Sequence, residues 1–279
     1  MASLIIDRKK IELNSSQTKM VISGWGEDVY NNSVVEKITY LSDGLKVKGY
    51  LAYPVESPGK LPCIIWNRGG MKESGAIDTF TARGVYGQMA SWGYVIFASQ
   101  YRGNAGGEGE EHLGGDDVND ILNLIPLANE IPQADTGKWG IEGWSRGGMM
   151  TYLTLRQNKN FKCAVLAGAI SSLKQNAEDN SRMKKVYESI ITGDDLDKEL
   201  EKRSAINFVN ELPSIPYLIM HGGADTTISP VQSIEIAKRF HSNNIPYRLV
   251  IFEGADHYLK THRKEVELLK KQWYEKYLG

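Results

Sequence analysis

Cysteine is scarce in this chain of 279 residues, which contains only Cys63 and Cys163. Each lies inside a short apolar run, LPCIIW or FKCAVLAG, that is typical of a buried strand. Two such thiols cannot build the disulfide framework of a small secreted domain, so we interpret both as structural cysteines of the core. No pair of His, Cys or carboxylate residues shows the spacing of a zinc site, and no metal ion is expected.

Long hydrophobic runs are also missing. No window approaches the ~20 apolar residues that a membrane-spanning helix requires. The first residues, MASLIIDRKKIELNSS, contain no apolar stretch of signal-peptide length, and their basic residues follow LII instead of preceding it. We therefore expect a cytoplasmic protein without a membrane partner.

The chain has almost no excess charge of either sign. Its 33 Lys and Arg residues stand against 34 Asp and Glu residues, which gives a formal net charge of -1. This balance gives no electrostatic reason to expect a nucleic acid or an anionic membrane as partner. Hydrophobic residues make up 41% of the chain, so a sizeable core can be buried. A small or neutral molecule is the partner that this composition favours.

Short apolar runs alternate with helix-like segments along most of the chain. Residues 34–53 contain two β-rich runs joined by Ser42-Asp43-Gly44, which predicts a hairpin. Nearly continuous apolar runs follow, namely LPCIIW, GYVIFAS, KWGIEGW, FKCAVLAG, IPYLIMHG and YRLVIFEG. Helical periodicity lies between them, as in DDVNDILNLIPLANE and PVQSIEIAKRFHSN. Strands that are apolar on both faces and separated by helices predict an α/β protein with a mostly parallel central sheet, covered by helices on both faces.

Two segments do not fit this alternation. Residues 1–33 are expected to form an added β segment or an arm, in front of one α/β domain that spans residues 34–279. Residues 171–213 are longer and more charged than a simple crossover requires. A short helical cap insertion and a solvated excursion on the surface explain this second segment equally well.

The strongest local motif is GWSRG at residues 143–147, which matches the pattern G-x-S-x-G. It follows KWGIEGW and precedes the helix-compatible MMTYLTLRQ, which is the strand-to-helix context of a nucleophile elbow. Glycines at the flanking positions let strand and helix pass closely, and Ser145 is then pushed out at the carboxyl end of the sheet. The amide of Arg146, at a helix N-terminus, would point towards an oxyanion. A serine that merely caps the helix is the alternative.

A serine nucleophile needs a base, and in the α/β-hydrolase fold the chain order is Ser, then acid, then His. Asp225 lies in HGGADTTISP, directly after the apolar run IPYLIM, and His257 lies in EGADHYLK, after RLVIFEG. All three residues therefore follow strands of one parallel sheet, where loops converge at the same edge. We predict that Ser145 is the nucleophile, His257 the general base and Asp225 the acid that orients it.

Other acids and histidines fit these roles less well. Asp256 is adjacent to His257, and adjacent side chains in an extended loop point apart, which favours Asp225 as the acid. His221 ends a strand and begins the acid loop, so we interpret it as a packing or turn residue. Surface positions explain the remaining histidines, which are His112, His241 and His262.

A second oxyanion donor is expected in the loop after LPCIIW, which reads Asn67-Arg68-Gly69-Gly70. Two glycines let the backbone approach a substrate carbonyl and leave amides free, although an ordinary glycine turn explains the same letters. The glycine-rich segment YRGNAGGEGEEHLGG lacks the GK[ST] ending of a phosphate loop. No cofactor is expected.

With these residues identified, residues 34–279 resemble the catalytic domain of the prolyl oligopeptidase family of serine peptidases and its stand-alone relatives among acyl hydrolases. The resemblance rests on DGLKVKGYLAYP, RGG, YRGNAGGEG, DDVNDI, GWSRGG, HGGADTTISP and GADHY, in this order. It implies an acyl-transfer enzyme in which Ser145, Asp225 and His257 form the triad. Large members of the family carry an N-terminal β-propeller, and the 33 residues before the hairpin are too few for one, so a stand-alone form is expected.

Two departures from the family pattern affect the expected substrate. The family often has Tyr before the Gly-Gly of the oxyanion loop, whereas this chain has Arg68, whose guanidinium or a backbone amide would have to replace the Tyr hydroxyl. Tyr also often follows the nucleophile, where this chain has Arg146. A peptidase that acts on short peptides is the first expectation, a carboxylesterase for short-chain esters is the second, and a non-catalytic binding module on the same fold is the third.

Overall fold

The computed structural model describes residues 3–193 and 195–279, which belong to two compact units. The first unit contains residues 3–68, 72–111 and 119–140, and the second contains residues 69–71, 112–118 and 141–279. Strand β6 (Ala134–Trp144) contributes its first residues to one unit and its last to the other. The strand order of the mixed nine-stranded sheet is β1-β2-β3-β5-β4-β6-β7-β8-β9.

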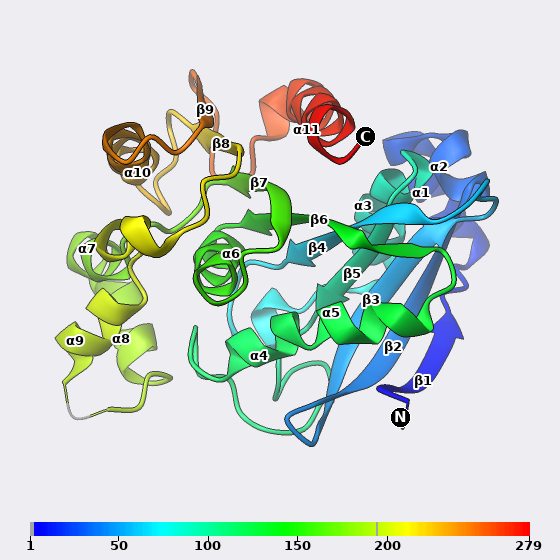
Figure 1. The fold of residues 1–279 in the computed structure, drawn as a ribbon, viewed down its shortest axis with the longest axis horizontal. Coiled ribbons are helices and arrows are strands. Elements are labelled where there is room, and N and C mark those ends of the chain that lie inside the picture. Colours follow the sequence, from blue (N-terminus) through cyan, green and yellow to red (C-terminus); the bar gives the residue numbers. More distant parts are fainter. Residues whose placement is uncertain (1–2, 194) are drawn as a thin grey trace. The chain divides into compact units, whose positions relative to one another are not determined.

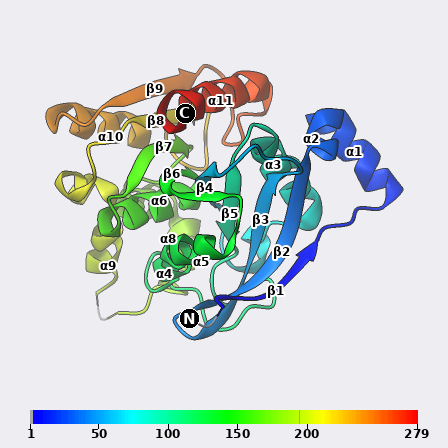
Figure 2. The same ribbon diagram turned by 45° about the vertical axis from the view of Figure 1, so that its right-hand side comes forward.

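Antiparallel strands dominate the first unit. Its strands are β1 (Ile5–Lys10), β2 (Ser33–Ser42), β3 (Leu45–Pro54), β4 (Leu61–Asn67) and β5 (Val95–Ser99). The pairs β1–β2, β2–β3 and β3–β5 are antiparallel and β4–β5 is parallel, as can be followed in Figure 2. The two loop residues between β2 and β3, Asp43 and Gly44, have φ of 51° and 82°, as tight hairpins require. The predicted hairpin is confirmed.

Helices of the first unit include two in the N-terminal segment that the sequence did not reveal. The helices are α1 (Ser15–Trp25), α2 (Glu27–Asn31), α3 (Thr79–Ser91) and α5 (Leu124–Leu127), with short 3-10 helices η1 (Lys72–Gly75) and η2 (Ala128–Glu130). Asn14 caps α1 in a capping box with Gln17. The buried guanidinium of Arg83 in α3 then donates to Ser33 Oγ at 2.7 Å and to the Ser33 carbonyl at 3.0 Å. The N-terminal segment is thus a strand followed by two docked helices.

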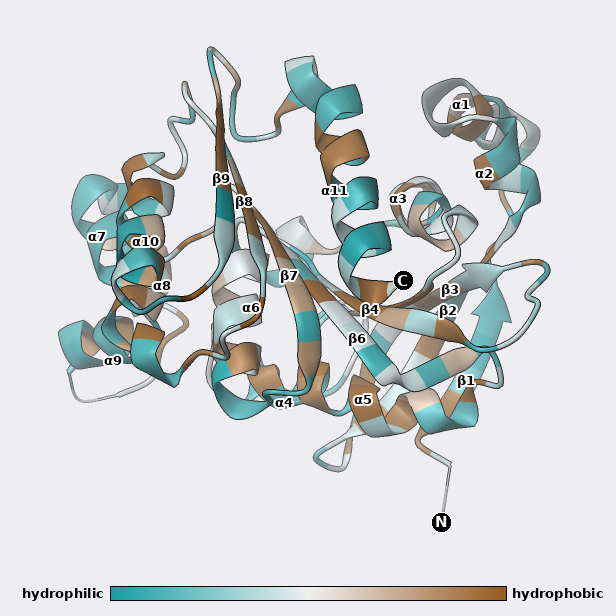
Figure 3. Ribbon diagram, turned by 45° about the horizontal axis from the view of Figure 1, so that its top comes forward, coloured by the Kyte–Doolittle hydropathy of each residue, from teal (hydrophilic) through white to brown (hydrophobic). Residues whose placement is uncertain are grey.

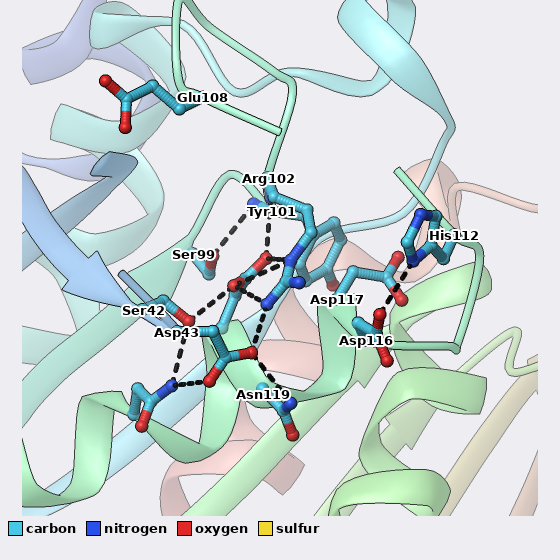
Figure 4. A network of polar contacts seen from close by, with 12 residues as sticks. Ser42, Asp43, Ser99, Tyr101, Arg102, Glu108, His112, Asp116, Asp117 and Asn119 are labelled. Carbon is cyan, nitrogen blue, oxygen red and sulfur yellow. Dashed lines mark hydrogen bonds and ion pairs between the residues drawn. The ribbon is translucent and has the colours of Figure 1, made fainter. Parts of the chain in front are cut away.

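A buried arginine fixes the hairpin within the first unit (Figure 4). Arg102 Nη2 lies 2.7 Å from Asp43 Oδ2 and 2.8 Å from Asp120 Oδ1, and the Arg102 amide donates to Asp120 Oδ2 at 2.7 Å. Asn119 adds a hydrogen bond of 2.8 Å to Asp43 Oδ2. Arg102 belongs to the YRGN segment and Asp120 to DDVND, so two of the segments on which the family resemblance rests have a structural role here. Asp120 lies in helix α4 (Asp117–Leu122).

Parallel strands and the helices that cover them form the second unit (Figure 1). Strands β7 (Phe161–Ala167), β8 (Tyr217–Gly222) and β9 (Tyr247–Phe252) are parallel neighbours. The main helices are α6 (Arg146–Gln157), α10 (Val231–Ser242) and α11 (Arg263–Leu278), preceded by η5 (Lys260–His262). Both α6 and α11 pack against β7, and Figure 1 shows them on opposite sides of that strand. Figure 3 shows β7 and β8 as mainly hydrophobic, as buried strands must be.

The long segment 171–213 is helical. It contains α7 (Leu173–Asp179), α8 (Ser181–Glu188), α9 (Leu196–Lys202) and two short 3-10 helices, η3 (Ala205–Asn207) and η4 (Val209–Glu211). Its α7 packs on both α8 and α9. That these helices act as a cap stays a prediction. Throughout residues 3–193 and 195–279, no helix combines the length and the apolar character that crossing a membrane would need.

Candidate active site

Ser145 lies in a sharp turn between β6 and α6. Its backbone has φ 58° and ψ -122°, which is rare and strained for a residue with a side chain. The turn is so tight that a Cβ on Gly143 would come within 2.1 Å of the Gly147 carbonyl oxygen, and one on Gly148 within 2.2 Å of Ala169 Cβ. The Ser145 side chain makes no capping hydrogen bond to α6. The geometry therefore argues against the alternative in which this serine is only a helix cap.

Asp225 and His257 are in direct contact. His257 Nδ1 lies 2.6 Å from Asp225 Oδ2, and both residues are buried. The other carboxylate oxygen, Asp225 Oδ1, accepts the amides of Thr227 at 2.8 Å and Ile228 at 2.9 Å. These amides come from the loop that carries Asp225, so the local backbone fixes the direction of the carboxylate. Nδ1 of His257 is thereby assigned as the protonated nitrogen, which leaves Nε2 as the basic one.

A second histidine, which was expected to be only a packing or turn residue, contacts this carboxylate. His221, at the end of β8, is fully buried, and its Nε2 lies 3.1 Å from Asp225 Oδ2 and 3.0 Å from the Ile228 carbonyl oxygen. Its Nδ1 lies 2.7 Å from Ser233 Oγ. If the Ser233 hydroxyl donates to Nδ1, Nε2 carries the proton that Asp225 accepts. The signal in the sequence was the four-residue separation of His221 and Asp225 in HGGAD.

Burial and hydrogen bonding act in opposite directions on the pKa of Asp225. Burial alone would raise this pKa. Hydrogen bonds from His221, from His257 and from the Ile228 amide outweigh burial and hold the pKa well below its ordinary value. The carboxylate is consequently ionised at neutral pH and suited to stabilise a positive imidazole beside it.

Ser145 and His257 share neighbours on both sides. The Ser145 amide donates to the Ala167 carbonyl at 2.9 Å, and a Cβ on the next residue, Gly168, would lie 3.3 Å from His257 Nδ1. On the other side, the ring centroids of Trp144 and His257 are 5.1 Å apart, and Trp144 Nε1 donates to the His257 carbonyl at 3.2 Å. Residues 145, 225 and 257 thus follow the strands β6, β8 and β9 of the second unit, and Asp225 and His257 are in contact there.

The side chain of Arg146 connects the elbow to the loop at Gly69 and Gly70. Its buried guanidinium lies 2.7 Å from Asp117 Oδ2 and donates to the Gly70 carbonyl at 3.1 Å. Asp117 Oδ1 in turn accepts the Gly114 amide at 2.8 Å. A Cβ on Gly69 would lie 2.8 Å from the Trp144 ring, so this loop packs directly on the residue before Ser145. The sequence pointed only to the amide of Arg146, and this role of its side chain was not predicted.

Arg68 lies in the first unit, and its guanidinium is engaged there. Two of its nitrogens donate to the Gln100 carbonyl at 3.1 and 2.8 Å, and it lies 3.6 Å from Glu111 Oε2. Its carbon Cζ lies 4.8 Å from the centre of the Tyr101 ring. With the guanidinium so occupied, a backbone amide is the better candidate for the second oxyanion donor.

The remaining titratable candidates lie elsewhere or face away. Asp256 is exposed, and its carboxylate accepts the amides of Tyr258 and Lys260. His241 is exposed on α10, His262 lies in η5, and His112 pairs with Asp116 at 3.4 Å. Within the part of the chain that the structure describes, no group of three or more His, Cys, Asp and Glu side chains could hold a metal ion.

Comparison with known proteins identifies relatives of this chain. The prolyl oligopeptidase family matches residues 83–279. An uncharacterized peptidase of Bacillus subtilis, YtmA, is 32% identical over 241 residues, which are 85% of this chain and 91% of that protein. Prolyl endopeptidase FAP of Mus musculus is 24% identical over 217 residues, which are 75% of this chain and 28% of that protein.

Solved structures share the fold. Acylaminoacyl peptidase of Pyrococcus horikoshii superposes with a TM-score of 0.79 at 22% identity, over 97% of this chain and 45% of that one. A puromycin-hydrolyzing peptidase of Mycobacterium tuberculosis gives a TM-score of 0.70 at 23% identity, over 85% of this chain and 38% of that one. The chain thus spans less than half of these solved chains, and the expected α/β-hydrolase fold is confirmed. Since the family matches most of the chain and a relative above 30% identity covers nearly all of it, the protein belongs to the prolyl oligopeptidase family of serine peptidases.

Proposed function

We propose that this protein hydrolyses short peptides or aminoacyl amides through a covalent acyl-enzyme on Ser145. The observation that carries the proposal is the 2.6 Å contact of His257 Nδ1 with Asp225 Oδ2, in a unit that also holds a strained serine whose side chain does not cap its helix. An ionised acid, an oriented imidazole and a serine at an elbow are the three parts that serine acyl transfer needs.

In the proposed reaction, His257 Nε2 takes the proton of the Ser145 hydroxyl while Oγ attacks the carbonyl carbon of the substrate. His257 then gives this proton to the leaving nitrogen, the C–N bond breaks, and the amine departs. Water attacks the acyl ester, His257 takes a proton from the water, and that proton returns to Ser145 Oγ as the acid product leaves. Asp225 keeps Nδ1 protonated and stabilises the imidazolium without taking the proton itself.

Oxyanion stabilisation is assigned to backbone amides. The amide of Arg146 stands at the first position of α6, where the helix dipole favours negative charge. The second donor is proposed in the Gly69–Gly70 loop, which the Arg146 guanidinium holds through the Gly70 carbonyl. Arg68 is not proposed to contact the substrate, because its guanidinium already donates to the Gln100 carbonyl.

We propose peptide bonds and not esters as the substrates, because the relatives are peptidases. The family consists of serine peptidases, and the bacterial relative that matches nearly this whole chain is described as a peptidase. The name of the acylaminoacyl peptidases with the same fold suggests aminoacyl compounds as the first to assay. Ester hydrolysis proceeds by the same chemical steps, so a carboxylesterase activity is the outcome to test against.

The test combines active-site labelling with a substrate panel. A fluorophosphonate is expected to label Ser145. The enzyme is expected to cleave aminoacyl p-nitroanilides, and the ratio of its kcat/KM for these amides to its kcat/KM for p-nitrophenyl butyrate should be higher than the ratio for an esterase. Ser145→Ala should stay folded and lose at least ~1000-fold in turnover. Ser242→Ala, which changes an exposed serine on α10, is the matched control and should keep full activity. Cleavage of esters alone would indicate a carboxylesterase, and failure of both labelling and turnover would indicate a binding module.

A further inference from the structure

Three rings meet beside the proposed catalytic base. The ring centroids of Trp144 and Tyr258 are 5.3 Å apart, those of Trp144 and His257 are 5.1 Å apart, and those of His257 and Tyr258 are 5.6 Å apart. Tyr258 is 60% exposed, which makes it the most exposed of the large hydrophobic side chains described. We name Trp144 and Tyr258 the aromatic platform. It offers apolar surface directly next to the imidazole.

The loop that carries Tyr258 is held in one conformation. The carboxylate of Asp256 accepts the amide of Tyr258 at 3.0 Å and the amide of Lys260 at 3.4 Å. Leu259 between them is buried, and its φ of 53° turns the chain back towards the protein. Lys260 Nζ lies 4.8 Å from the centre of the Tyr258 ring. An exposed aromatic ring that is fixed in this way loses little conformational entropy when it binds a ligand.

Trp144 extends the platform towards the oxyanion loop. Its indole N–H is used in the hydrogen bond to the His257 carbonyl, so the apolar part of the ring is what remains for contacts. The same ring packs on Gly69, where no side chain would fit. One continuous aromatic wall therefore leads from the Gly69–Gly70 loop past His257 to Tyr258.

The chemistry of the base decides which part of a substrate meets this wall. His257 must give its proton to the leaving nitrogen when the C–N bond breaks, so the leaving amine lies at the imidazole at that moment. Side chains that pack on the imidazole are consequently neighbours of the leaving group. The acyl part of the substrate is bound to Ser145 Oγ and approaches the oxyanion donors instead.

We propose that Trp144 and Tyr258 form a subsite for an aromatic or large apolar side chain on the first residue of the leaving group. This inference rests on the proposed function and narrows its substrates to short peptides with such a residue directly after the scissile bond. An aromatic contact of this kind changes discrimination between substrates by about tenfold.

The experiment varies only the leaving group. Four substrates share one acyl residue and carry glycinamide, alaninamide, leucinamide or phenylalaninamide after the scissile bond, and kcat/KM is measured for each. In the unmodified enzyme phenylalaninamide is expected to exceed glycinamide by about tenfold or more. Tyr258→Ala should bring this ratio close to one, whereas Tyr258→Phe, which keeps the ring, should retain it. Tyr247→Ala removes a partly exposed aromatic side chain at the amino end of β9 and is the matched control.

Deacylation separates a subsite from a structural support of His257. After acylation the leaving group has gone, so a leaving-group subsite affects kcat/KM for the amides but not the hydrolysis rate of a common acyl-enzyme formed from a p-nitrophenyl ester. Added phenylalaninamide should also intercept this acyl-enzyme better than glycinamide, and Tyr258→Ala should abolish that difference. Attack of the added amine on the acyl-enzyme is the reverse of acylation and uses the same subsite. The preference among added amines must therefore agree with the preference among the amide substrates.

Two outcomes would overturn the proposal while leaving the proposed function intact. The first is Ser145-dependent cleavage with equal kcat/KM for glycinamide and phenylalaninamide. The second is a Tyr258→Ala enzyme in which kcat/KM for all the amides and the rate of deacylation fall by the same factor, since Tyr258 would then only position the base. An enzyme that reacts with neither a fluorophosphonate nor any substrate of the panel would contradict the proposed function and this inference together.

Discussion

Arg146 shows how a single buried charge can serve two purposes. Its guanidinium is almost fully buried, pairs with Asp117 at 2.7 Å and donates to the carbonyl of Gly70 at 3.1 Å. A buried ion pair contributes little net stability, because its attraction is offset by the loss of hydration. The hydrogen bond to Gly70 gives the residue a second role, which is to position the loop proposed to hold the oxyanion.

Arg146→Met is therefore expected to reduce stability and activity for separable reasons. Leaving Asp117 as an unpaired buried charge should cost about 3 to 5 kcal/mol of unfolding free energy, measured by urea denaturation. Loss of the support for Gly70 should lower kcat by about 100-fold with little change in KM, since an oxyanion contact is made only in the transition state.

The double variant Arg146→Met with Asp117→Asn distinguishes these effects. It removes the unpaired charge, so most of the lost stability should return, whereas kcat should stay low because the Gly70 carbonyl is still unsupported. Recovery of kcat together with stability would show that Arg146 acts on the fold alone.

The environment of Asp225 illustrates the limit of reading single residues from a sequence. The loop HGGADTTISP placed the acid after a strand, which needs only the local order of apolar and polar residues. His221 and His257 both contact the same carboxylate oxygen of Asp225. This arrangement depends on the curvature of the loop through residues 222–228, which no periodicity of the sequence encodes. The same holds for the Arg146 side chain, whose partners Asp117 and Gly70 are distant along the chain.

At the scale of single elements, the turn from β6 to α6 leaves very little room for an added side chain. A Cβ on Gly148 would come within 2.2 Å of Ala169 Cβ and 2.8 Å of Ala169 Cα, and neither is the end of a flexible side chain. Helix α6 could make room only by moving away from the chain after β7. Such a shift would also move Ser145, whose amide is bonded to Ala167 at 2.9 Å.

We expect Gly148→Ala to destabilise the protein by about 1 to 3 kcal/mol, as overpacking in a closed site does. It should also lower kcat/KM, because Ser145, the proposed nucleophile, is displaced. Gly24→Ala is the matched control, since Gly24 lies in helix α1 with nothing within 4 Å of the added Cβ. Alanine favours a helix over glycine, so this variant should gain about 0.5 to 1 kcal/mol. Thermal or urea unfolding measures the change in stability of both variants. Equal changes for Gly148→Ala and Gly24→Ala would show that close packing at Gly148 does not limit stability.

Secondary structure was predictable where the apolar pattern was strong. The runs LPCIIW, GYVIFAS, KWGIEGW, FKCAVLAG, IPYLIMHG and YRLVIFEG all form strands, since strands buried on both faces leave few polar letters. Helices α1 and α2 were missed because only Val21 and Val29 within them are buried, which is too few to produce a visible period. Both helices pack on α3, which lies far along the chain. The segment DDVNDILNLIPLANE forms three short helical pieces, with Pro126 near the break.

At the scale of the whole molecule, near-balanced charge conceals carboxylates whose pKa the fold lowers. In the second unit Arg203 and Lys202 donate to Glu199 and lower its pKa. In the first unit partial burial would raise the pKa of Asp43, but hydrogen bonds from Arg102 and two asparagines lower it. Asp120 behaves in the opposite way, because burial raises its pKa more than Arg102 and Ser42 lower it. Stability against acid is therefore a sum of contributions of both signs. Among the described carboxylates whose pKa is shifted, more have a lowered pKa than a raised one.

The acid limb of stability should depend measurably on Asp225. Its folded pKa lies below its unfolded value of about 4, so the stabilisation that its ionised form provides is complete above about pH 4 and is lost as the pH falls towards the folded pKa. Asp225→Asn lacks this ionisation, so its unfolding free energy should be lower than that of the unmodified protein at about pH 7 and should approach it at about pH 3. Urea denaturation at intervals across this range measures both curves. Asp197→Asn changes an exposed carboxylate of α9 and should follow the unmodified protein throughout. A constant difference between Asp225→Asn and the unmodified protein at every pH would show that the hydrogen bonds to His221 and His257 do not hold the carboxylate in its ionised form.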